Sequence, residues 1–163
     1  MNTAINLAQT AESLGNFLTT TQSRIVTAES CTGGWLAQAI TDIAGCSSWF
    51  DRGFITYSNE SKVDMLNVCP STLSQFGAVS AEVARQMTQG ALQNSLADYA
   101  IAITGVAGPT GGSQKKPVGT VYLAWQKKGQ DAEVILEHFI GNRQEIRRQA
   151  VYKALNLIPP VSL

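Results

Sequence analysis

The sequence has no net charge, and this absence excludes several classes of partner. Twelve lysine and arginine residues balance twelve acidic residues in a chain of 163. A nonspecific nucleic-acid binder presents an excess of positive charge to phosphates, and a peripheral membrane protein presents one to anionic lipid. We therefore expect neither nucleic acid nor a membrane as a partner.

Histidine and cysteine are also scarce. The chain has a single histidine, His138, and three cysteines, Cys31, Cys46 and Cys69. They form no CxxC pair and no cluster with the spacing of a zinc site, so we expect no metal. Three cysteines cannot all pair with one another, and reduced thiols are the simplest interpretation.

The sequence lacks a long hydrophobic run, and it lacks the basic start and apolar stretch of a signal peptide. We therefore expect a cytoplasmic protein. Repeats, linkers and low-complexity segments are absent too, while 44% hydrophobic and 15% charged residues are typical of a globular chain. The length predicts one domain over residues 1–163.

What is present is an alternation of helical and extended patterns. Apolar positions three and four residues apart predict helices over residues 3–22, 30–45, 58–66, 80–91 and 142–158, the last ended by Pro159 and Pro160. Extended patterns predict strands at residues 24–28, 54–57, 98–104, 118–125 and 133–139, the last two as a hairpin. This order predicts an α/β fold, a three-layer α/β/α sandwich with a mixed, mostly parallel β-sheet.

Polar residues follow three of the predicted strands. Ser30 comes after the first strand, Tyr57 ends the second, and Thr104 and Gly105 end the third. In sheets of this kind ligands bind beyond the carboxyl ends of the strands. We therefore expect these residues to converge on one edge of the sheet.

The stretch from Thr27 to Gly34 joins a strand directly to a helix. This arrangement predicts Ser30 and Cys31 at a helix N-terminus, where unpaired N–H groups and the helix dipole favour an anion. The anion is either a phosphate or the oxyanion of an acyl-transfer intermediate. Ser30 is accordingly either a helix cap or a nucleophile, and the residues alone leave both open.

A serine nucleophile needs a base, and Lys62 is the stronger candidate. His138 lies in a predicted strand, distant in sequence from the three turns. Lys62 falls in the first turn of a predicted helix, where the dipole and partial burial lower the pKa of its amine. We interpret Lys62 as a general base and Tyr57 as its proton relay. The alternatives are a solvated lysine and a packed aromatic ring.

Other side chains near the turn have two interpretations each. Cys31 is a rival nucleophile or a small buried hydrophobe, and we favour the second. Glu29 either orients a substrate or is an ordinary polar residue at a strand end. Trp49 and Phe50 are either a homodimer contact or part of the core.

Two segments offer groups that suit an anion. The loop Gly105–Ser113 contains four glycines, which let backbone N–H groups approach an anion closely, but a mobile connection is the alternative. Arg143, Arg147 and Arg148 begin the last helix, where the dipole disfavours cations. They suit bidentate phosphate recognition or form a solvated basic face.

Three motifs, taken together, resemble the C-terminal domain family of the competence/damage-inducible protein CinA. They are TAESCTGG at 27–34, GFITYSNESK at 53–62, and TGVAGP at 104–109 with glycines at 111–112 and KPVGTV at 116–121. The motifs occur in order, and the resemblance covers essentially the whole chain. It is closest to the stand-alone members, which lack the larger N-terminal domain of full-length relatives.

The resemblance implies hydrolysis of nicotinamide mononucleotide to nicotinic acid mononucleotide and ammonia, in pyridine nucleotide salvage, without metal or cofactor. By matching motif, Ser30 would be the nucleophile, Lys62 the general base and Tyr57 its helper, with backbone groups after Ser30 binding the oxyanion. We expect the substrate-binding residues to be Glu29, Cys31, Thr32, Gly33, Thr104, Gly105, Gly108, Gly111, Gly112 and Arg143. The alternative is a non-catalytic nucleotide-binding or regulatory module.

Overall fold

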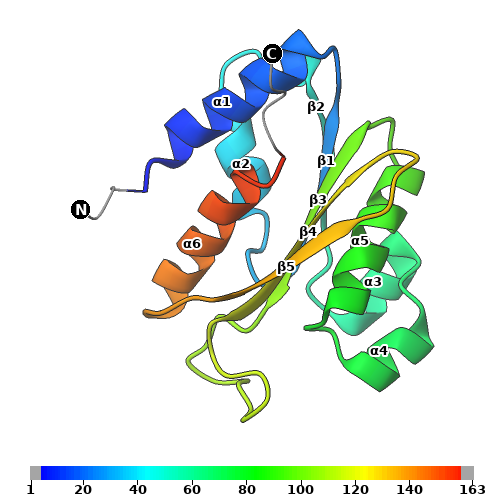
Figure 1. Ribbon diagram of the computed structural model, residues 1–163, viewed down its shortest axis with the longest axis vertical. Coiled ribbons are helices and arrows are strands. Elements are labelled where there is room, and N and C mark those ends of the chain that lie inside the picture. Colours follow the sequence, from blue (N-terminus) through cyan, green and yellow to red (C-terminus); the bar gives the residue numbers. More distant parts are fainter. Residues whose placement is uncertain (1–4, 159–163) are drawn as a thin grey trace.

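The computed structural model describes residues 5–158, in which helices and strands alternate along most of the chain (Figure 1). The elements are α1 (Leu7–Thr20), β1 (Ile25–Glu29), α2 (Trp35–Thr41), the 3-10 helix η1 (Cys46–Ser48), β2 (Phe50–Ile55), α3 (Asn59–Leu66), α4 (Pro70–Phe76), α5 (Ala81–Gln93), β3 (Tyr99–Gly105), β4 (Thr120–Lys127), β5 (Glu133–His138) and α6 (Arg143–Leu155). The residues predicted to end α6, Pro159 and Pro160, lie outside the described range.

The strands form one mixed sheet in the order β2-β1-β3-β4-β5. Strand β1 pairs in parallel with β2 and β3, while β4 pairs antiparallel with both β3 and β5. Only β4 therefore runs against the other strands, which confirms the predicted mixed, mostly parallel sheet. The predicted hairpin is β4–β5.

Helices cover both faces of the sheet and complete the three predicted layers. Figure 1 shows α1, α2 and α6 on one face and α3, α4 and α5 on the other. Side chains of β3 alternate between two cores: Ile101 and Ile103 face the first group, while Ala100 and Ala102 face α5. The alanines leave room for α5 to pack closely on the sheet.

Strand β2 and helices α2 and α4 differ from the sequence prediction. Helix α2 begins at Trp35 rather than at residue 30. Strand β2 begins at Phe50 rather than at residue 54, because residues from Phe50 onward pair with β1. Residue 53 of this strand has no room for a side chain, because a Cβ there would lie only 2.7 Å from the hydroxyl oxygen of Thr27, and glycine avoids this clash. The helix α4 was not predicted, and Pro70 is its first residue, where a missing N–H costs no hydrogen bond.

The aromatic pair considered as a dimer contact belongs to the core. Trp49 is 3% exposed, and its indole packs against Gly15. A Cβ on Gly15 would lie only 2.6 Å from a carbon of the indole ring. Phe50 is partly buried and packs on the same cluster. Neither residue supplies a reason for a dimer. Within residues 5–158, no helix is both long and apolar enough to cross a membrane.

Candidate active site

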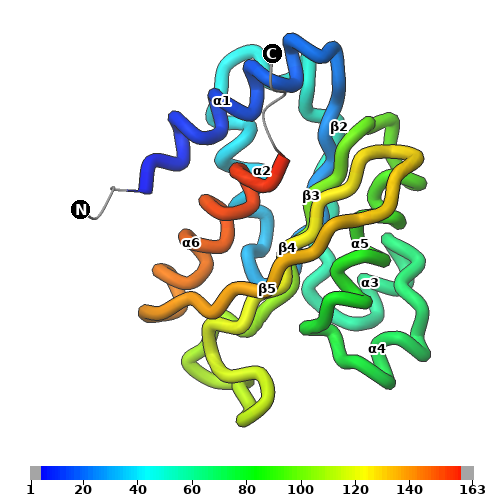
Figure 2. Tube along the Cα trace, viewed as in Figure 1, coloured from blue at the N-terminus to red at the C-terminus, as the bar shows by residue number. Residues whose placement is uncertain are grey.

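Three parallel strands end at the same edge of the sheet, as predicted. Glu29 at the end of β1 is in register with Ile55 of β2 and Ile103 of β3, so the residues that follow them meet. The loop from β3 to β4 projects beyond this edge (Figure 2, yellow-green). A cavity of about 370 Å³ opens here. The residues that the sequence placed after the three strands therefore converge on one edge of the sheet, as expected.

Nine of the predicted site residues line this cavity: Ser30, Cys31, Tyr57, Lys62, Thr104, Gly105, Gly108, Gly111 and Arg143. Six further lining residues were not predicted: Asn59, Ala78, Val79, Val106, Ala107 and Thr110. The hydroxyl of Thr104 donates to the carbonyl of Ala78 over 2.8 Å, which draws the segment before α5 into the wall. No local pattern in the sequence signals this contact.

The amine of Lys62 is buried against Ser30. Lys62 is 1% exposed, and its Nζ donates to Oγ of Ser30 at 3.1 Å and to the carbonyl oxygen of Thr56 at 2.7 Å. None of the ion pairs found within residues 5–158 includes Lys62. Burial therefore lowers the pKa of Lys62 below its ordinary value, which favours the neutral amine.

The start of α3 aims this lysine inward. Ser58 caps the helix, and its side chain and that of Ser61 form a reciprocal capping box. The N–H of Lys62 then donates to the carbonyl of Ser58 at 3.2 Å. Ser58 is thus the cap of α3, and it fixes the first turn of the helix, from which Lys62 reaches Ser30 and Thr56.

Ser30 does not lie at the N-terminus of α2, as the sequence predicted, and the N–H groups of the first turn of α2 already have an acceptor. The helix begins at Trp35, after a turn in which Gly33 and Gly34 have positive φ values of 59° and 100°. The buried carboxylate of Glu29 accepts from the N–H groups of Leu36 at 2.8 Å and Ala37 at 3.1 Å. Those N–H groups are therefore not free for a phosphate or an oxyanion.

Within residues 5–158, the turn itself leaves three backbone N–H groups without an acceptor, those of Cys31, Thr32 and Gly34, and the first two lie beside Ser30. The N–H of Ser30 donates to the carbonyl of Ile103, and that of Gly33 donates back to the carbonyl of Ser30. Among the hydrogen bonds of the described chain, the N–H groups of Cys31 and Thr32 have no acceptor. The unpaired backbone donors near Ser30 therefore lie in the turn that follows it and not at the helix start.

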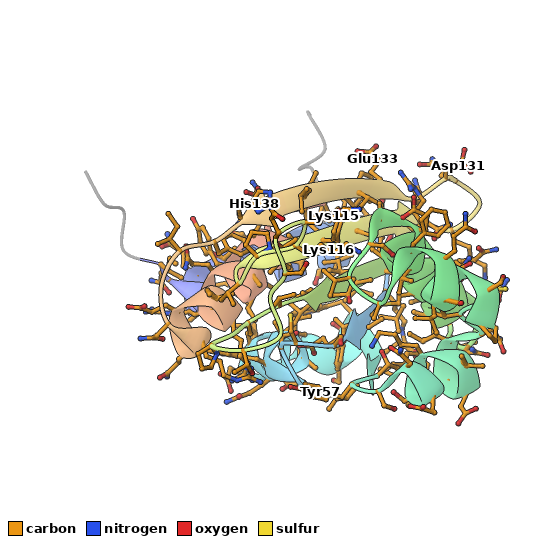
Figure 3. The ribbon with its side chains drawn as sticks, turned by 90° about the horizontal axis from the view of Figure 1, so that it is seen from below. Tyr57, Lys115, Lys116, Asp131, Glu133 and His138 are labelled. Carbon is orange, nitrogen blue, oxygen red and sulfur yellow. The ribbon has the colours of Figure 1, made fainter. Side chains whose placement is uncertain are left out.

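Arg143 ties two walls of the cavity together. Its guanidinium donates to the hydroxyl of Tyr57 at 3.0 Å and to the carbonyl of Gly108 at 2.8 Å. Tyr57 is 61% exposed, and Figure 3 shows it at the edge of the molecule. Its hydroxyl is therefore bonded to Arg143 and makes no hydrogen bond to Lys62 or Ser30.

Four predicted substrate-binding residues do not line the cavity. Glu29 caps α2, and Thr32 is fully buried. Gly33 faces the side chain of Arg147, and Gly112 packs against the backbone of Val118. The lone histidine, His138, lies in β5 on the side of the molecule opposite Tyr57 (Figure 3). It does not take part in this site.

The thiol of Cys31 lies beside Ser30 but is a poor nucleophile. Cys31 is 6% exposed, and burial raises the pKa of its thiol to about 11. Because the thiolate is the reactive form, the protonated thiol is nearly inert at neutral pH. This agrees with the interpretation of Cys31 as a small buried side chain.

Replacing Cys31 by alanine tests this assignment. We expect Cys31→Ala to retain most of the enzymatic activity of the wild-type chain, because a protonated thiol contributes only packing at this position. The measurement is the rate of ammonia release from an amide substrate. A loss as large as that caused by removing the hydroxyl of Ser30 would transfer the role of nucleophile to the thiol.

The fold and the site define an α/β protein with a serine–lysine pair in a polar cavity at the carboxyl edge of the sheet. The model of the CinA C-terminal domain matches residues 7–161. The chain belongs to this family.

Characterised relatives and solved structures agree with this assignment. The chain is 50% identical over 152 residues to the nicotinamide-nucleotide amidohydrolase PncC of Escherichia coli K12, covering 93% of this chain and 92% of that protein. It is 48% identical over 148 residues to the enzyme of the same name from Pseudomonas putida, covering 90% and 91%. The crystal structure of the competence/damage inducible protein CihA from Agrobacterium tumefaciens has a TM-score of 0.91 at 45% identity, covering 93% and 92%.

Proposed function

We propose that this protein hydrolyses the carboxamide of nicotinamide mononucleotide (NMN) to nicotinic acid mononucleotide and ammonia, with Ser30 as nucleophile and Lys62 as general base. The observation that carries the proposal is the buried amine of Lys62, which lies 3.1 Å from Oγ of Ser30 and forms no ion pair with a carboxylate of residues 5–158. The names of the relatives from E. coli and P. putida support the substrate.

The acylation half begins with attack of the Ser30 oxygen on the amide carbon, while neutral Lys62 takes the hydroxyl proton. The carbonyl oxygen becomes an oxyanion, and the N–H groups of Cys31 and Thr32, which have no acceptor within residues 5–158, are the donors that we propose for it. Protonated Lys62 then gives its proton to the amide nitrogen. The carbon–nitrogen bond breaks, ammonia leaves, and the acyl group stays on Ser30 as an ester.

The deacylation half reverses these roles. Water attacks the ester carbon, and Lys62, neutral again, takes a proton from the water. The second tetrahedral intermediate collapses with the Ser30 oxygen as leaving group, and Lys62 returns its proton to that oxygen. The products are the carboxylic acid of the nucleotide and the free enzyme, so the two halves together consume one water and release one ammonia.

The remaining cavity residues are proposed to hold the nucleotide. Arg143 is a suitable partner for the phosphate, because its fork of donors already lies at the cavity between Tyr57 and Gly108. The glycine-rich loop around Gly108 and Gly111 brings backbone close to the ligand. Tyr57 stays a prediction as helper of Lys62, a role for which its hydroxyl would have to leave Arg143.

The proposal is tested by incubating the protein with NMN and measuring ammonia in a coupled assay, with nicotinic acid mononucleotide identified by chromatography. We expect both products in equal amounts, and the same rate with and without a chelator, because Ser30 and Lys62 supply the nucleophile and the base. Binding of NMN without turnover would instead favour the non-catalytic nucleotide-binding module. Turnover abolished by the chelator would contradict the proposed roles.

The pH profile gives an independent prediction. Lys62 acts as a base only when its amine is neutral, and burial lowers the pKa of that amine below its ordinary value of 10.5. We therefore expect kcat/KM to rise with pH through this lowered pKa and to level off before pH 10.5. A profile that is flat, or that falls as the amine loses its proton, would exclude Lys62 as the base.

A further inference from the structure

Arg147 holds the turn after Ser30 from the far side, without lining the cavity. Its Nε donates to the carbonyl of Cys31 and its Nη2 to the carbonyl of Thr32, both at 3.0 Å. The guanidinium carbon lies 5.3 Å from the ring centroid of Trp35, at the first residue of α2. One side chain of α6 thus contacts two successive peptide groups and the helix that follows them.

These contacts fix the direction of a backbone donor. In a trans peptide group the C=O and N–H point in opposite directions, and the only cis peptide in residues 5–158 precedes Pro109. Because Arg147 binds the carbonyl of Cys31, the N–H of Thr32 in the same peptide group points away from Arg147. This N–H is one of the two without an acceptor beside Ser30.

The second contact holds the next peptide group. Arg147 binds the carbonyl of Thr32, and the N–H of Gly33 in that group closes the turn on the carbonyl of Ser30 at 3.1 Å. The two donors of one planar guanidinium therefore fix two peptide planes at once, which a single ammonium does not do. Oxyanion donors are effective when they are oriented before the reaction begins.

We propose that Arg147 is a positioning residue for the oxyanion site: it holds the turn so that the N–H of Thr32 faces the carbonyl oxygen of the substrate. The inference rests on the proposed role of Ser30 as nucleophile. It differs from the interpretation of the arginines of α6 as phosphate ligands, because both hydrogen bonds of Arg147 go to the protein's own backbone.

The test is Arg147→Met, which keeps an apolar stem against Trp35 but removes both donors. We expect kcat for NMN to fall at least about tenfold, up to the loss of about 10²–10³-fold seen when an oxyanion donor is removed. We expect KM and the pH profile to stay close to wild type, because Arg147 does not itself line the cavity and makes no hydrogen bond to Lys62. We expect the kcat of Arg147→Lys, which keeps the positive charge but lacks the two fixed donors of a guanidinium, to lie between those of wild type and Arg147→Met.

Arg148→Met is the matched control, because Arg148 adjoins Arg147 in α6 but donates to the carbonyl of Ile5 at 2.8 Å. We expect it to leave kcat unchanged and to report the effect on thermal unfolding of losing an arginine from this helix. If Arg147→Met does not fold, the comparison is made with Arg147→Lys. An unchanged kcat, or a raised KM with kcat intact, overturns the positioning role.

A reaction with a fluorophosphonate separates this inference from the identity of the substrate. The probe phosphonylates a reactive serine, and its oxygen occupies the same oxyanion site. We expect labelling at Ser30, slowed at least about tenfold by Arg147→Met. Labelling without NMN hydrolysis would refute the proposed substrate while leaving Arg147 to be judged by the labelling rates. Equal rates in wild type and variant, or no labelling of Ser30, would overturn the inference.

Discussion

Replacing Ser30 by alanine will lower the rate of ammonia release from NMN by at least about 10⁴-fold, because it removes the atom that bonds to the substrate carbon. Nucleophile replacements elsewhere leave only the catalysis supplied by binding and the oxyanion site. Binding of NMN should survive, since the residues proposed to hold the nucleotide lie in other walls of the cavity. Initial rates and calorimetric titration measure the two effects separately.

The adjacent Cys31→Ala variant controls for disturbance of the turn in Ser30→Ala. Both positions are buried beside the cavity, and both changes remove one polar atom. The account predicts a large loss in the serine variant and a small one in the cysteine variant. Undiminished ammonia release by Ser30→Ala would refute the proposed mechanism, whatever the cysteine variant does.

Replacing Lys62 by methionine will lower kcat/KM by at least about 10³-fold, within the range that general bases contribute. Methionine has nearly the length of lysine, but its thioether is not a base and has no hydrogen to donate. The change also removes an amine whose burial is unfavourable, which offsets the lost hydrogen bonds to Ser30 and Thr56. We therefore expect the unfolding temperature to stay within about 4 °C of wild type.

Lys153→Met is the control for this second prediction. Lys153 is a surface lysine of α6, paired with Glu137 at 2.9 Å and 43% exposed. Surface ion pairs contribute little, so its loss should change neither turnover nor stability measurably. If Lys62→Met were as active as Lys153→Met, Lys62 would have no part in the reaction.

The arrangement of the site followed from the sequence where short-range patterns decide it. Three predicted strands, with Ser30, Tyr57 and Thr104–Gly105 at or after their ends, predicted a common edge, and the cavity lies there. The last helix, predicted from residue 142, begins behind a capping box in which Asn142 and Glu145 exchange two hydrogen bonds. A helix cap depends on residues three apart in the sequence, and the order of strands and turns can also be read from the sequence directly.

The turn after Ser30 was beyond prediction because its conformation depends on distant residues. Two glycines with positive φ lengthen it, and the register of the strands brings Glu29 beneath the first turn of α2. Arg147, which holds two of its carbonyls, is more than a hundred residues away along the chain. The sequence thus predicted unpaired amide groups near Ser30 but placed them at the start of α2, whereas they lie in the preceding turn.

The arginines at the start of α6 show the same limit. Their unfavourable place in the helix dipole suggested a ligand, yet each one donates to a backbone carbonyl elsewhere in the fold. Arg143 reaches Gly108, Arg147 reaches Cys31 and Thr32, and Arg148 reaches Ile5. Their cost in the dipole is offset by tertiary hydrogen bonds that no local pattern displays.

Acid quenching during turnover shows whether the acyl group of NMN passes through the oxygen of Ser30. The enzyme is mixed with excess NMN, quenched during turnover, digested and analysed by mass spectrometry of the peptide that contains Ser30 and Cys31. The account predicts the acyl group of the nucleotide as an ester on Ser30, absent from Ser30→Ala. An adduct on the thiol of Cys31, or ammonia release at the wild-type rate by Ser30→Ala, would contradict it.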